Sequence, residues 1–426
     1  MNLSRRGFLR NLGLNAARAT GIVGASSHLF PAWMPKLVFS PLGQDAGQRD
    51  VLIAIFQRGG MDGLNAVVPY GEGSGYYDRR PSIAIPEPDG SDTSAIDLDG
   101  FFGLHPALRP LQAIFQDGAL GIVHAAGSPD PSRSHFDAME YMERGIPGDK
   151  MTGTGWITRH LQTAAWENGS PFRAVGMGAL LPSSLRGEPS ALSLRSIADF
   201  HLAGRQDQLV SVQRTLAGLY QIDTGADLMS AKASGVLNTL EMMNALSQEQ
   251  YIPANGATYP DGEFGHGMRQ VAQLIKAEVG LEVACIDIGG WDTHDYQGGV
   301  DGQFAYLLDE FARTLEAFYA DMHDYMARIT VVSMSEFGRT AGENASGGTD
   351  HGHGNAMFVM GGAVNGGMYA NWPGLHDEAL DQSDLAITTD YRDVLAEILV
   401  KRVQNNALES IFPGYTPSML NIVREG

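Results

Sequence analysis

Short runs of apolar residues alternate along the chain with segments of helical periodicity, and most of the apolar runs end in a glycine-rich turn. Near-continuous apolar runs of this length are typical of buried parallel strands, which are covered on both faces. The predicted strands lie within residues 50–65, 120–127, 172–178, 281–290, 328–338 and 356–362. Strands and helices that alternate in this way predict right-handed crossovers and an α/β fold, a three-layer sandwich around a mainly parallel central sheet.

Residues from about 206 to 250 depart from this alternation, because they hold two long amphipathic helical patterns with no apolar run between them. We expect a helical insertion over the sheet, acting as a lid or a dimer surface. Polar stretches rich in Gly and Asp elsewhere are expected to be loops rather than linkers between domains. The sequence therefore predicts a single α/β domain over residues 41–426, with a helical insertion at about 206–250.

The motif "SRRGFLR" at residues 4–10 matches a twin-arginine export signal, in which an arginine pair precedes an aromatic residue and a leucine. The alternative is a basic amphipathic helix at the N-terminus of the mature protein. The following segment, residues 11–30, is too short and too polar for a stable membrane span. We expect a signal region over residues 1–40, recognition by the twin-arginine export machinery, and a periplasmic or extracellular location.

The charge balance excludes one class of partner. The chain has 49 acidic residues against 29 basic ones, a formal net charge of −20. Because nucleic-acid binding is driven by neutralisation of phosphates, nucleic acid is excluded and an anionic membrane surface is disfavoured. The single cysteine, Cys285, excludes an intrachain disulfide, and its apolar neighbours predict a core position.

Acidic, basic, hydroxyl and imidazole side chains gather where the predicted strands end. Ligands of open α/β sheets bind outside the carboxyl ends of the strands, so these positions are candidates for one shared site. They are Arg58 and Asp62 after the first strand, Ser132, Arg133 and Ser134 after the second, Asp292 and His294 after the fourth, Glu336 and Arg339 after the fifth, and His351 and His353 before the sixth.

Each position also has a purely structural interpretation. Asp62 follows two glycines and can cap a turn. Asp292 and His294 can form an Asx turn beside a core histidine, and Glu336 can pair with a neighbouring arginine. The glycines around His351 and His353 make a turn there, so one of the two histidines can orient a ligand rather than be one. The structural interpretation needs five coincidences at one sheet edge.

Several of these segments together resemble a known family. The motifs are "VLIAIFQRGGMDGLN", "GSPDPSRSHFDAMEYMERG", "IDIGGWDTHD", "SEFGRT" and "GGTDHGHGNAMFVMGG". They resemble the domain of unknown function 1501 family of exported bacterial proteins, and the likeness covers about residues 4 to 400. More distantly, the chain resembles the alkaline phosphatase and sulfatase superfamily, whose α/β sheet carries two divalent metals and a hydroxyl nucleophile. That likeness implies an alkaline-phosphatase-like fold.

The resemblance also implies roles for individual residues. Asp62 corresponds to the first metal-binding aspartate, and Asp292 and His294 to a later ligand pair, although their spacing is shorter than in alkaline phosphatase. His353 corresponds to the last histidine ligand. Ser134 holds the place of the nucleophile, with Ser132 as its rival.

Two departures from the superfamily pattern limit the resemblance. In "SEFG", Glu336 can replace the usual acid, but Phe337 stands where a histidine ligand is expected, which puts the second metal site in doubt. Pro129 stands where sulfatases keep the Cys or Ser that becomes formylglycine, which argues against formylglycine chemistry.

These residues predict a divalent metal ion as cofactor. The candidate metal ligands are Asp62, Asp292, His294, Glu336, His351 and His353. A mixed Asp and His set favours zinc, with manganese or calcium as alternatives. Arg58 or Arg133 would clamp the oxygens of an anionic substrate.

The sequence thus favours an exported metal-dependent hydrolase of a phosphate, phosphonate or sulfate ester, on a small molecule or a polymer. The competing hypothesis is a non-catalytic envelope protein that uses the same scaffold for binding or assembly. A dinucleotide-binding Gly-x-Gly-x-x-Gly and a Gly-x-Ser-x-Gly nucleophile elbow are both missing from the expected turns.

Overall fold

The computed structural model describes residues 49–165, 168–187, 191–197, 243, 246 and 250–426. The predicted signal region at residues 1–40 lies outside this part of the chain, and so does nearly all of the predicted helical insertion at about 206–250. None of the helices within the described residues is long and apolar enough to cross a membrane.

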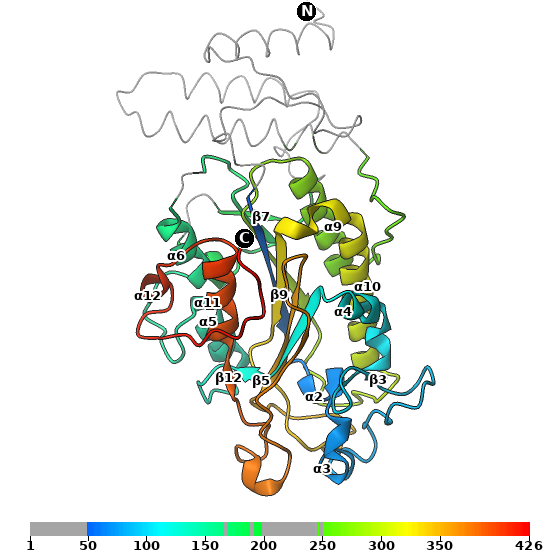
Figure 1. Ribbon diagram of the computed structural model, residues 1–426. Helices are drawn as coiled ribbons and strands as arrows, with labels where there is room; N and C mark the ends of the chain where they lie inside the picture. Colours follow the sequence, from blue (N-terminus) through cyan, green and yellow to red (C-terminus); the bar gives the residue numbers. More distant parts are fainter. Residues whose placement is uncertain (1–48, 166–167, 188–190, 198–242, 244–245, 247–249) are drawn as a thin grey trace, which may run out of the picture.

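Nine strands of the described chain form one large sheet (Figure 1). Its order is β11-β5-β10-β9-β1-β8-β6-β7, and β12 pairs with β5. The strands are β1 (Val51–Arg58), β5 (Leu120–Gly127), β6 (Ala174–Met177), β7 (Ala191–Leu194), β8 (Val283–Gly289), β9 (Ile329–Met334), β10 (Asn355–Met360), β11 (Gly367–Tyr369) and β12 (Thr389–Asp390). All six predicted apolar runs contain a strand of this sheet.

Every neighbouring pair in the sheet is parallel except the two that involve β10, which is antiparallel to both β5 and β9. The predicted α/β fold with a mainly parallel sheet is therefore confirmed. The reversal of β10 also has a consequence for the site. Residues that precede β10 lie at the same edge of the sheet as residues that follow β1, β5, β8 and β9.

Helices cover both faces of the sheet because the side chains of each buried strand alternate between two apolar cores. On β1, Ile53 and Ile55 face the core that contains α9 (Glu263–Lys276), α10 (Gln303–Asp321) and α4 (Gln112–Gln116). Residues Leu52, Ala54 and Phe56 face the core that contains α5 (His135–Arg144), α6 (Trp156–Thr163), α11 (Tyr391–Lys401) and α12 (Leu408–Ile411). Figure 1 shows these two groups of helices on opposite sides of the sheet.

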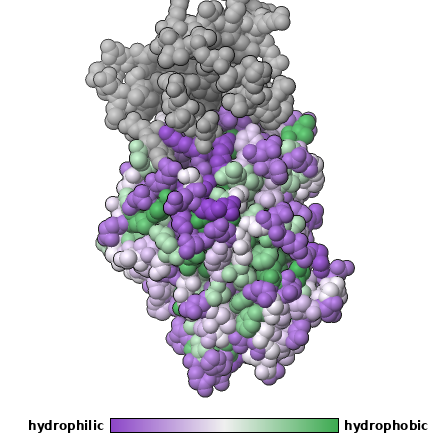
Figure 2. Space-filling view, in the orientation of Figure 1, coloured by the Kyte–Doolittle hydropathy of each residue, from purple (hydrophilic) through white to green (hydrophobic). Residues whose placement is uncertain are grey.

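Short elements complete the edge of the sheet where the predicted site lies. A small sheet of order β2-β4-β3 accompanies the helices that follow β1. These elements are α2 (Gly63–Ala66), β2 (Val67–Val68), α3 (Ser74–Tyr77), β3 (Ile96–Asp97) and β4 (Gly103–Leu104). On the face shown in Figure 2, hydrophobic residues form separate patches between hydrophilic ones.

Two local expectations are refined by the structure. The helical pattern before β5 begins as a 3₁₀ helix over Pro106–Leu111, within which Pro110 has no main-chain N–H to donate, and becomes the α-helix α4 only afterwards. Helix α5 starts directly after Ser134, whose hydroxyl could cap it, but the Ser134 hydroxyl makes no capping hydrogen bond. Cys285 is a buried free thiol, which confirms its predicted core position.

Three histidines are buried as neutral rings. The Nδ1 atoms of His105 and His124 each accept a main-chain N–H, at 3.0 and 2.8 Å, and the Nδ1 of His160 accepts from the Asn405 amide at 2.9 Å. An imidazole nitrogen that accepts a hydrogen bond carries no proton. Burial lowers the pKa of each of these three histidines to about 4.

These histidines predict that the protein loses stability in mild acid. Between the ordinary histidine pKa of 6.5 and the folded value of about 4, the unfolded chain binds protons that the folded chain rejects. Stability conferred by the neutral rings is full above pH 6.5 and falls with pH by about 1.4 kcal/mol per unit for each histidine. Urea unfolding at several pH values measures this slope. His160→Gln removes one of the titrating groups, so the slope of stability against pH is expected to fall by about 1.4 kcal/mol per pH unit. An unchanged slope in that variant would contradict the conclusion that His160 is buried as a neutral ring.

Candidate metal centre

Four side chains from three segments meet at the carboxyl edge of the sheet. They are His135 at the start of α5, Asp292 and His294 after β8, and His351 before β10, and we call them the histidine cluster. Oδ1 of Asp292 lies 3.0 Å from Nε2 of His294 and 3.1 Å from Nε2 of His351, and these two nitrogens are 2.9 Å apart. Nε2 of His135 lies 3.3 Å from Oδ2 of Asp292.

The orientation of the three rings follows from what their other nitrogens contact. Each Nδ1 faces an oxygen that only accepts, at a distance of 2.7 to 2.9 Å. The pairs are His135 with Oε1 of Glu336, His294 with Oδ1 of Asp350, and His351 with the main-chain carbonyl of Arg133. A proton on each Nδ1 leaves a lone pair on each Nε2. When all three rings are neutral, three lone pairs and a carboxylate therefore converge. The hydrogen bond to Glu336 raises the pKa of His135, so a proton competes with a metal ion for its Nε2.

This donor set fits a divalent metal ion. Zinc binds imidazole nitrogen at about 2.0–2.1 Å in tetrahedral sites, which places neighbouring ligand atoms about 3.3 Å apart. The ligand atoms of His135, Asp292 and His351 all lie within 4.8 Å of one another, and Nε2 of His135 is buried without a hydrogen bond. Hydrogen bonds from Nδ1 to carboxylate or carbonyl oxygens are the usual support of metal-binding histidines. His135, Asp292, His294 and His351 would hold the ion.

The guanidinium of Arg339 holds the surrounding loops in place. It is buried, and it donates to Oδ1 of Asp292 at 2.8 Å and to the carbonyls of Gly60, Trp291 and Thr349 at 2.6, 2.8 and 2.9 Å. Burial alone would raise the pKa of the Asp292 carboxyl, but the hydrogen bond and the positive charge of the Arg339 guanidinium help to lower it to about 2. Asp292 is therefore ionised at neutral pH.

The ring of Phe337 packs against two histidines of the cluster, His135 and His351. Its ring centroid lies 4.9 Å from that of His135 and 4.7 Å from that of His351. Gly60, which has a positive φ of 71°, leaves room for this ring, because a Cβ there would lie 2.6 Å from it. In the superfamily that the sequence resembles, a histidine ligand is expected at the position of Phe337. The structure has an apolar wall there instead.

Comparison with known proteins gives a family. A family model described as "Protein of unknown function (DUF1501)" matches residues 119–403. The chain belongs to this family. The predicted family resemblance is thereby confirmed, and the match includes every member of the histidine cluster. No curated protein matches the chain.

Two solved structures are similar to this DUF1501 protein. One is the PsFucS1 sulfatase from Pseudoalteromonas sp., with 10% identity and a TM-score of 0.37, over 85% of this chain and 69% of that one. The other is the lipoteichoic acid synthase LtaP from Listeria monocytogenes, with 8% identity and a TM-score of 0.31, over 88% and 79% of the two chains. At these TM-scores neither carries an argument about activity.

Three predicted metal ligands of the DUF1501 chain lie outside the cluster, and two of them, Asp62 and His353, have other partners. Asp62 is buried, caps α2 by accepting from the N–H of Asn65, and pairs at 2.6 Å with both Arg80 and the Gln297 amide. This matches the turn-cap interpretation. The two ring nitrogens of His353 face Oδ2 of Asp381 at 2.8 Å and the carbonyl of Ser128 at 3.1 Å. Neither residue presents a free ligand atom to the histidine cluster.

Glu336, the third predicted ligand outside the cluster, accepts a hydrogen bond from one of its histidines. Its side chain is buried, and Oε1 accepts from Nδ1 of His135 at 2.7 Å and from the N–H of Gly59 at 2.8 Å. His135 was not among the predicted ligands, and Asp350, which orients His294, was not either. Both stand directly beside predicted residues, Ser134 and His351, in the same polar motifs.

The predicted substrate-binding arginines already have acidic partners. Arg58 pairs with Asp287 at 2.6 Å and with Glu143 at 3.3 Å. The guanidinium of Arg133 contacts the buried carboxylate of Asp384. The structure thus places both guanidinium groups in ion pairs, and neither belongs to the cluster.

The two predicted serine nucleophiles lie in the loop that leads to His135. Ser134 is exposed, directly precedes His135, and its hydroxyl makes no hydrogen bond with any other described residue. The Ser132 hydroxyl accepts from the N–H of Ser134 at 3.3 Å. Ser134 therefore has the more accessible hydroxyl.

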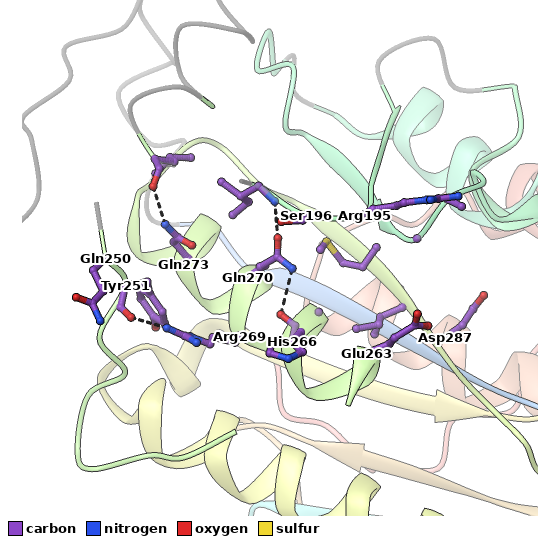
Figure 3. A pocket seen from close by; sticks show the side chains of 17 residues that line it. Arg195, Ser196, Gln250, Tyr251, Glu263, His266, Arg269, Gln270, Gln273 and Asp287 are labelled. Atoms are coloured by element: carbon purple, nitrogen blue, oxygen red, sulfur yellow. Dashed lines mark hydrogen bonds between the residues drawn. The ribbon is translucent and has the colours of Figure 1, made fainter. Parts of the chain in front are cut away.

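A separate cavity of about 840 Å³ lies along α9 (Figure 3). Its lining combines basic and acidic side chains, among them Arg269, Glu263 and Asp287, and contains no member of the histidine cluster. In Figure 3, Arg269 donates to the Tyr251 carbonyl, at 2.8 Å. The cavity therefore adds no ligand to the candidate metal centre.

The contact between Glu336 and His135 predicts a measurable effect on metal affinity. Glu336→Gln keeps an oxygen that accepts from His135 and Gly59 but removes the negative charge that strengthens the imidazole as a ligand. We expect zinc affinity to fall about tenfold to a hundredfold, with little change in thermal stability. Competition with a zinc-binding dye measures the affinity. Unchanged affinity in a folded variant would show that His135 does not bind the ion.

Proposed function

We propose that this DUF1501 protein is an exported metal-dependent hydrolase of a phosphate, phosphonate or sulfate ester, and that it leaves the cytoplasm by the twin-arginine route. The observation that carries the proposal is the convergence of three imidazole Nε2 atoms and a carboxylate, each imidazole held by an acceptor at Nδ1. The motif "SRRGFLR" supports the export route.

Zinc is the ion that the donor set favours. Bound there, it would supply Lewis acidity, which favours loss of a proton from an oxygen nucleophile and offsets negative charge on the ester. Ser134 is the proposed nucleophile, because its hydroxyl is exposed and adjoins His135 in sequence. The first main-chain N–H groups of the ten-residue helix α5 lie beside it and can meet a negatively charged oxygen.

The charges around the cluster restrict the ester further. Asp292, Glu336 and Asp350 carry three negative charges if all are ionised, and Arg339 carries one positive charge, a sum of −2. A divalent ion cancels that sum, while Arg58 and Arg133 remain in ion pairs with other residues. The site therefore favours an ester with a single negative charge over a highly charged one.

The competing function is a non-catalytic envelope protein that binds a metal for stability or assembly. The position of Phe337, which packs against the cluster where a second metal ligand is expected, favours this alternative. Both functions require the metal. Only hydrolysis requires a nucleophile, so the two are separated by the serine variants below.

The first prediction concerns metal content. Purified mature protein is expected to hold one zinc per chain, and His351→Ala to lose it, because His351 supplies a lone pair to the cluster. His353→Ala is the matched control, since His353 is the same residue type two positions away and faces Asp381 and Ser128 instead. Elemental analysis after gentle purification measures the metal. Equal zinc in both variants would refute the proposed ligand set.

The second prediction concerns the nucleophile. Ser134→Ala is expected to lower kcat for an aryl phosphate or sulfate ester by at least about a hundredfold, equivalent to ~2.7 kcal/mol of barrier. Zinc content should stay unchanged. Ser132→Ala serves as control, with at most a small loss. Full turnover in Ser134→Ala would assign the nucleophile elsewhere, and no turnover by zinc-loaded wild-type protein would favour the non-catalytic function.

A further inference from the structure

Two exposed aromatic residues are close in sequence to members of the histidine cluster. Phe136 follows His135 on α5 and is 87% exposed, and Tyr296 comes two residues after His294 and is 85% exposed. They belong to different segments, which meet where Nε2 of His135 approaches Asp292. Single exposed aromatic residues need no explanation. Two on adjoining segments, each within two residues of a proposed metal ligand, are candidates for an apolar border to the site; we call them the aromatic border.

The conformation of Tyr296 indicates that its position is maintained by the fold. Its φ is 50°, in the left-handed region that bulky residues rarely adopt. Main-chain hydrogen bonds from Tyr296 to Ser346 at 3.1 Å and from Gln297 to Gly347 at 3.0 Å hold this backbone. The Gln297 side chain is buried and donates to Asp62. Residues in sparsely populated conformations persist where the surroundings enforce them, often at functional sites.

Phe136 is held equally firmly, because it lies in the first turn of α5. The N–H of Ala138 donates to the carbonyl of Ser134, so the turn that carries Phe136 is hydrogen-bonded. A rigid aromatic ring loses little entropy when a ligand packs on it. Main-chain hydrogen bonds therefore fix the backbone that carries each of the two rings.

The charged residues adjacent to the two rings are acidic. Asp137 follows Phe136, Asp295 precedes Tyr296, and Asp350 contacts His294. Tyr296 and Asp295 are exposed, and so is Asp350. A group that packs against the rings next to these carboxylates binds better if it carries no negative charge.

We propose that Phe136 and Tyr296 are substrate-positioning residues that bind the non-reacting part of the ester, and that this part is an uncharged group with a flat apolar face, an arene or a pyranose ring. The inference rests on the proposed function, because it assigns the substrate class of the same site. The anionic end of the substrate meets the histidine cluster, and its flat face packs on the aromatic border. Packing of this kind is expected to strengthen binding by about tenfold.

The test compares pairs of ligands that differ only in the flat group. Calorimetry on the zinc-loaded protein measures the affinities of benzenesulfonate against methanesulfonate, and of glucose 6-sulfate against glycerol sulfate, each of which carries one negative charge. We expect the ring-bearing member of at least one pair to bind about tenfold more tightly. A preference in the first pair identifies an arene, and a preference in the second identifies a pyranose.

Variants then locate the preference. Tyr296→Gly removes the ring and suits the left-handed backbone, so it should keep or raise the melting temperature while it lowers the affinity ratio. Phe136→Ala should lower the ratio as well, and the double variant should bring it to about one. Tyr306→Ala is the control, because Tyr306 is exposed on α10 and outside the segments that carry the cluster.

The outcomes separate the two proposals. Equal affinities within both pairs, or a ratio that survives in the double variant, would overturn the assignment of Phe136 and Tyr296. Failure of the proposed function would appear earlier and differently, as wild-type protein that holds no stoichiometric zinc.

Discussion

The buried guanidinium of Arg339 is the interaction on which the candidate metal centre depends. Its hydrogen bonds reach the loops after β1 and β8 and the segment before β10, which are far apart in the sequence. No single strand supplies this site, so its geometry requires that these loops stay in register with one another. A buried cation that satisfies five carbonyl or carboxylate groups, the carbonyl of Gly59 included, achieves this. Its removal would leave those groups unpaired at a cost of several kcal/mol.

The histidines of this protein fall into two groups that differ in which nitrogen carries the proton. In the core, His105, His124 and His160 accept at Nδ1, so each lone pair on Nδ1 is already satisfied within the protein. In the cluster, Nδ1 faces an acceptor, and the lone pair on Nε2 is directed at other lone pairs. The core histidines therefore need no metal ion or other cation to satisfy their lone pairs. The second arrangement is favourable when a metal ion, or a proton on one of the Nε2 atoms, lies between the nitrogens.

Much of this arrangement could be predicted from the sequence because it follows from local patterns. The apolar runs that became β1, β5 and β10 located the strands, and the rule that ligands bind at strand ends located Asp292, His294 and His351. The same reasoning could not separate His351 from His353, since glycines flank both. Their difference comes from distant partners, the carbonyl of Arg133 for one and Asp381 for the other.

Long-range pairing also explains the remaining differences. Asp62 has the sequence context of a ligand, and only the folded chain shows that Arg80 occupies its carboxylate. Glu336 was correctly assigned to the site. It does not face the proposed metal position, however, but accepts a hydrogen bond from the ligand His135. His135 itself was missed because a histidine after a serine that can begin a helix resembles any first helical residue. Its significance depends on Asp292, which lies more than 150 residues away.

Charge links the cluster to the rest of the molecule. A chain with a net charge of −20 repels anions at long range, but salt screens that field beyond about 8–10 Å. Under the proposed function, binding of an anionic ester would therefore rest on contacts within the site, where a bound ion and the end of α5 would act at close distance. An uncharged group bound by Phe136 and Tyr296 would add affinity without adding repulsion. The acidic surface and the aromatic border thus favour the same kind of substrate, one negative charge joined to a neutral ring.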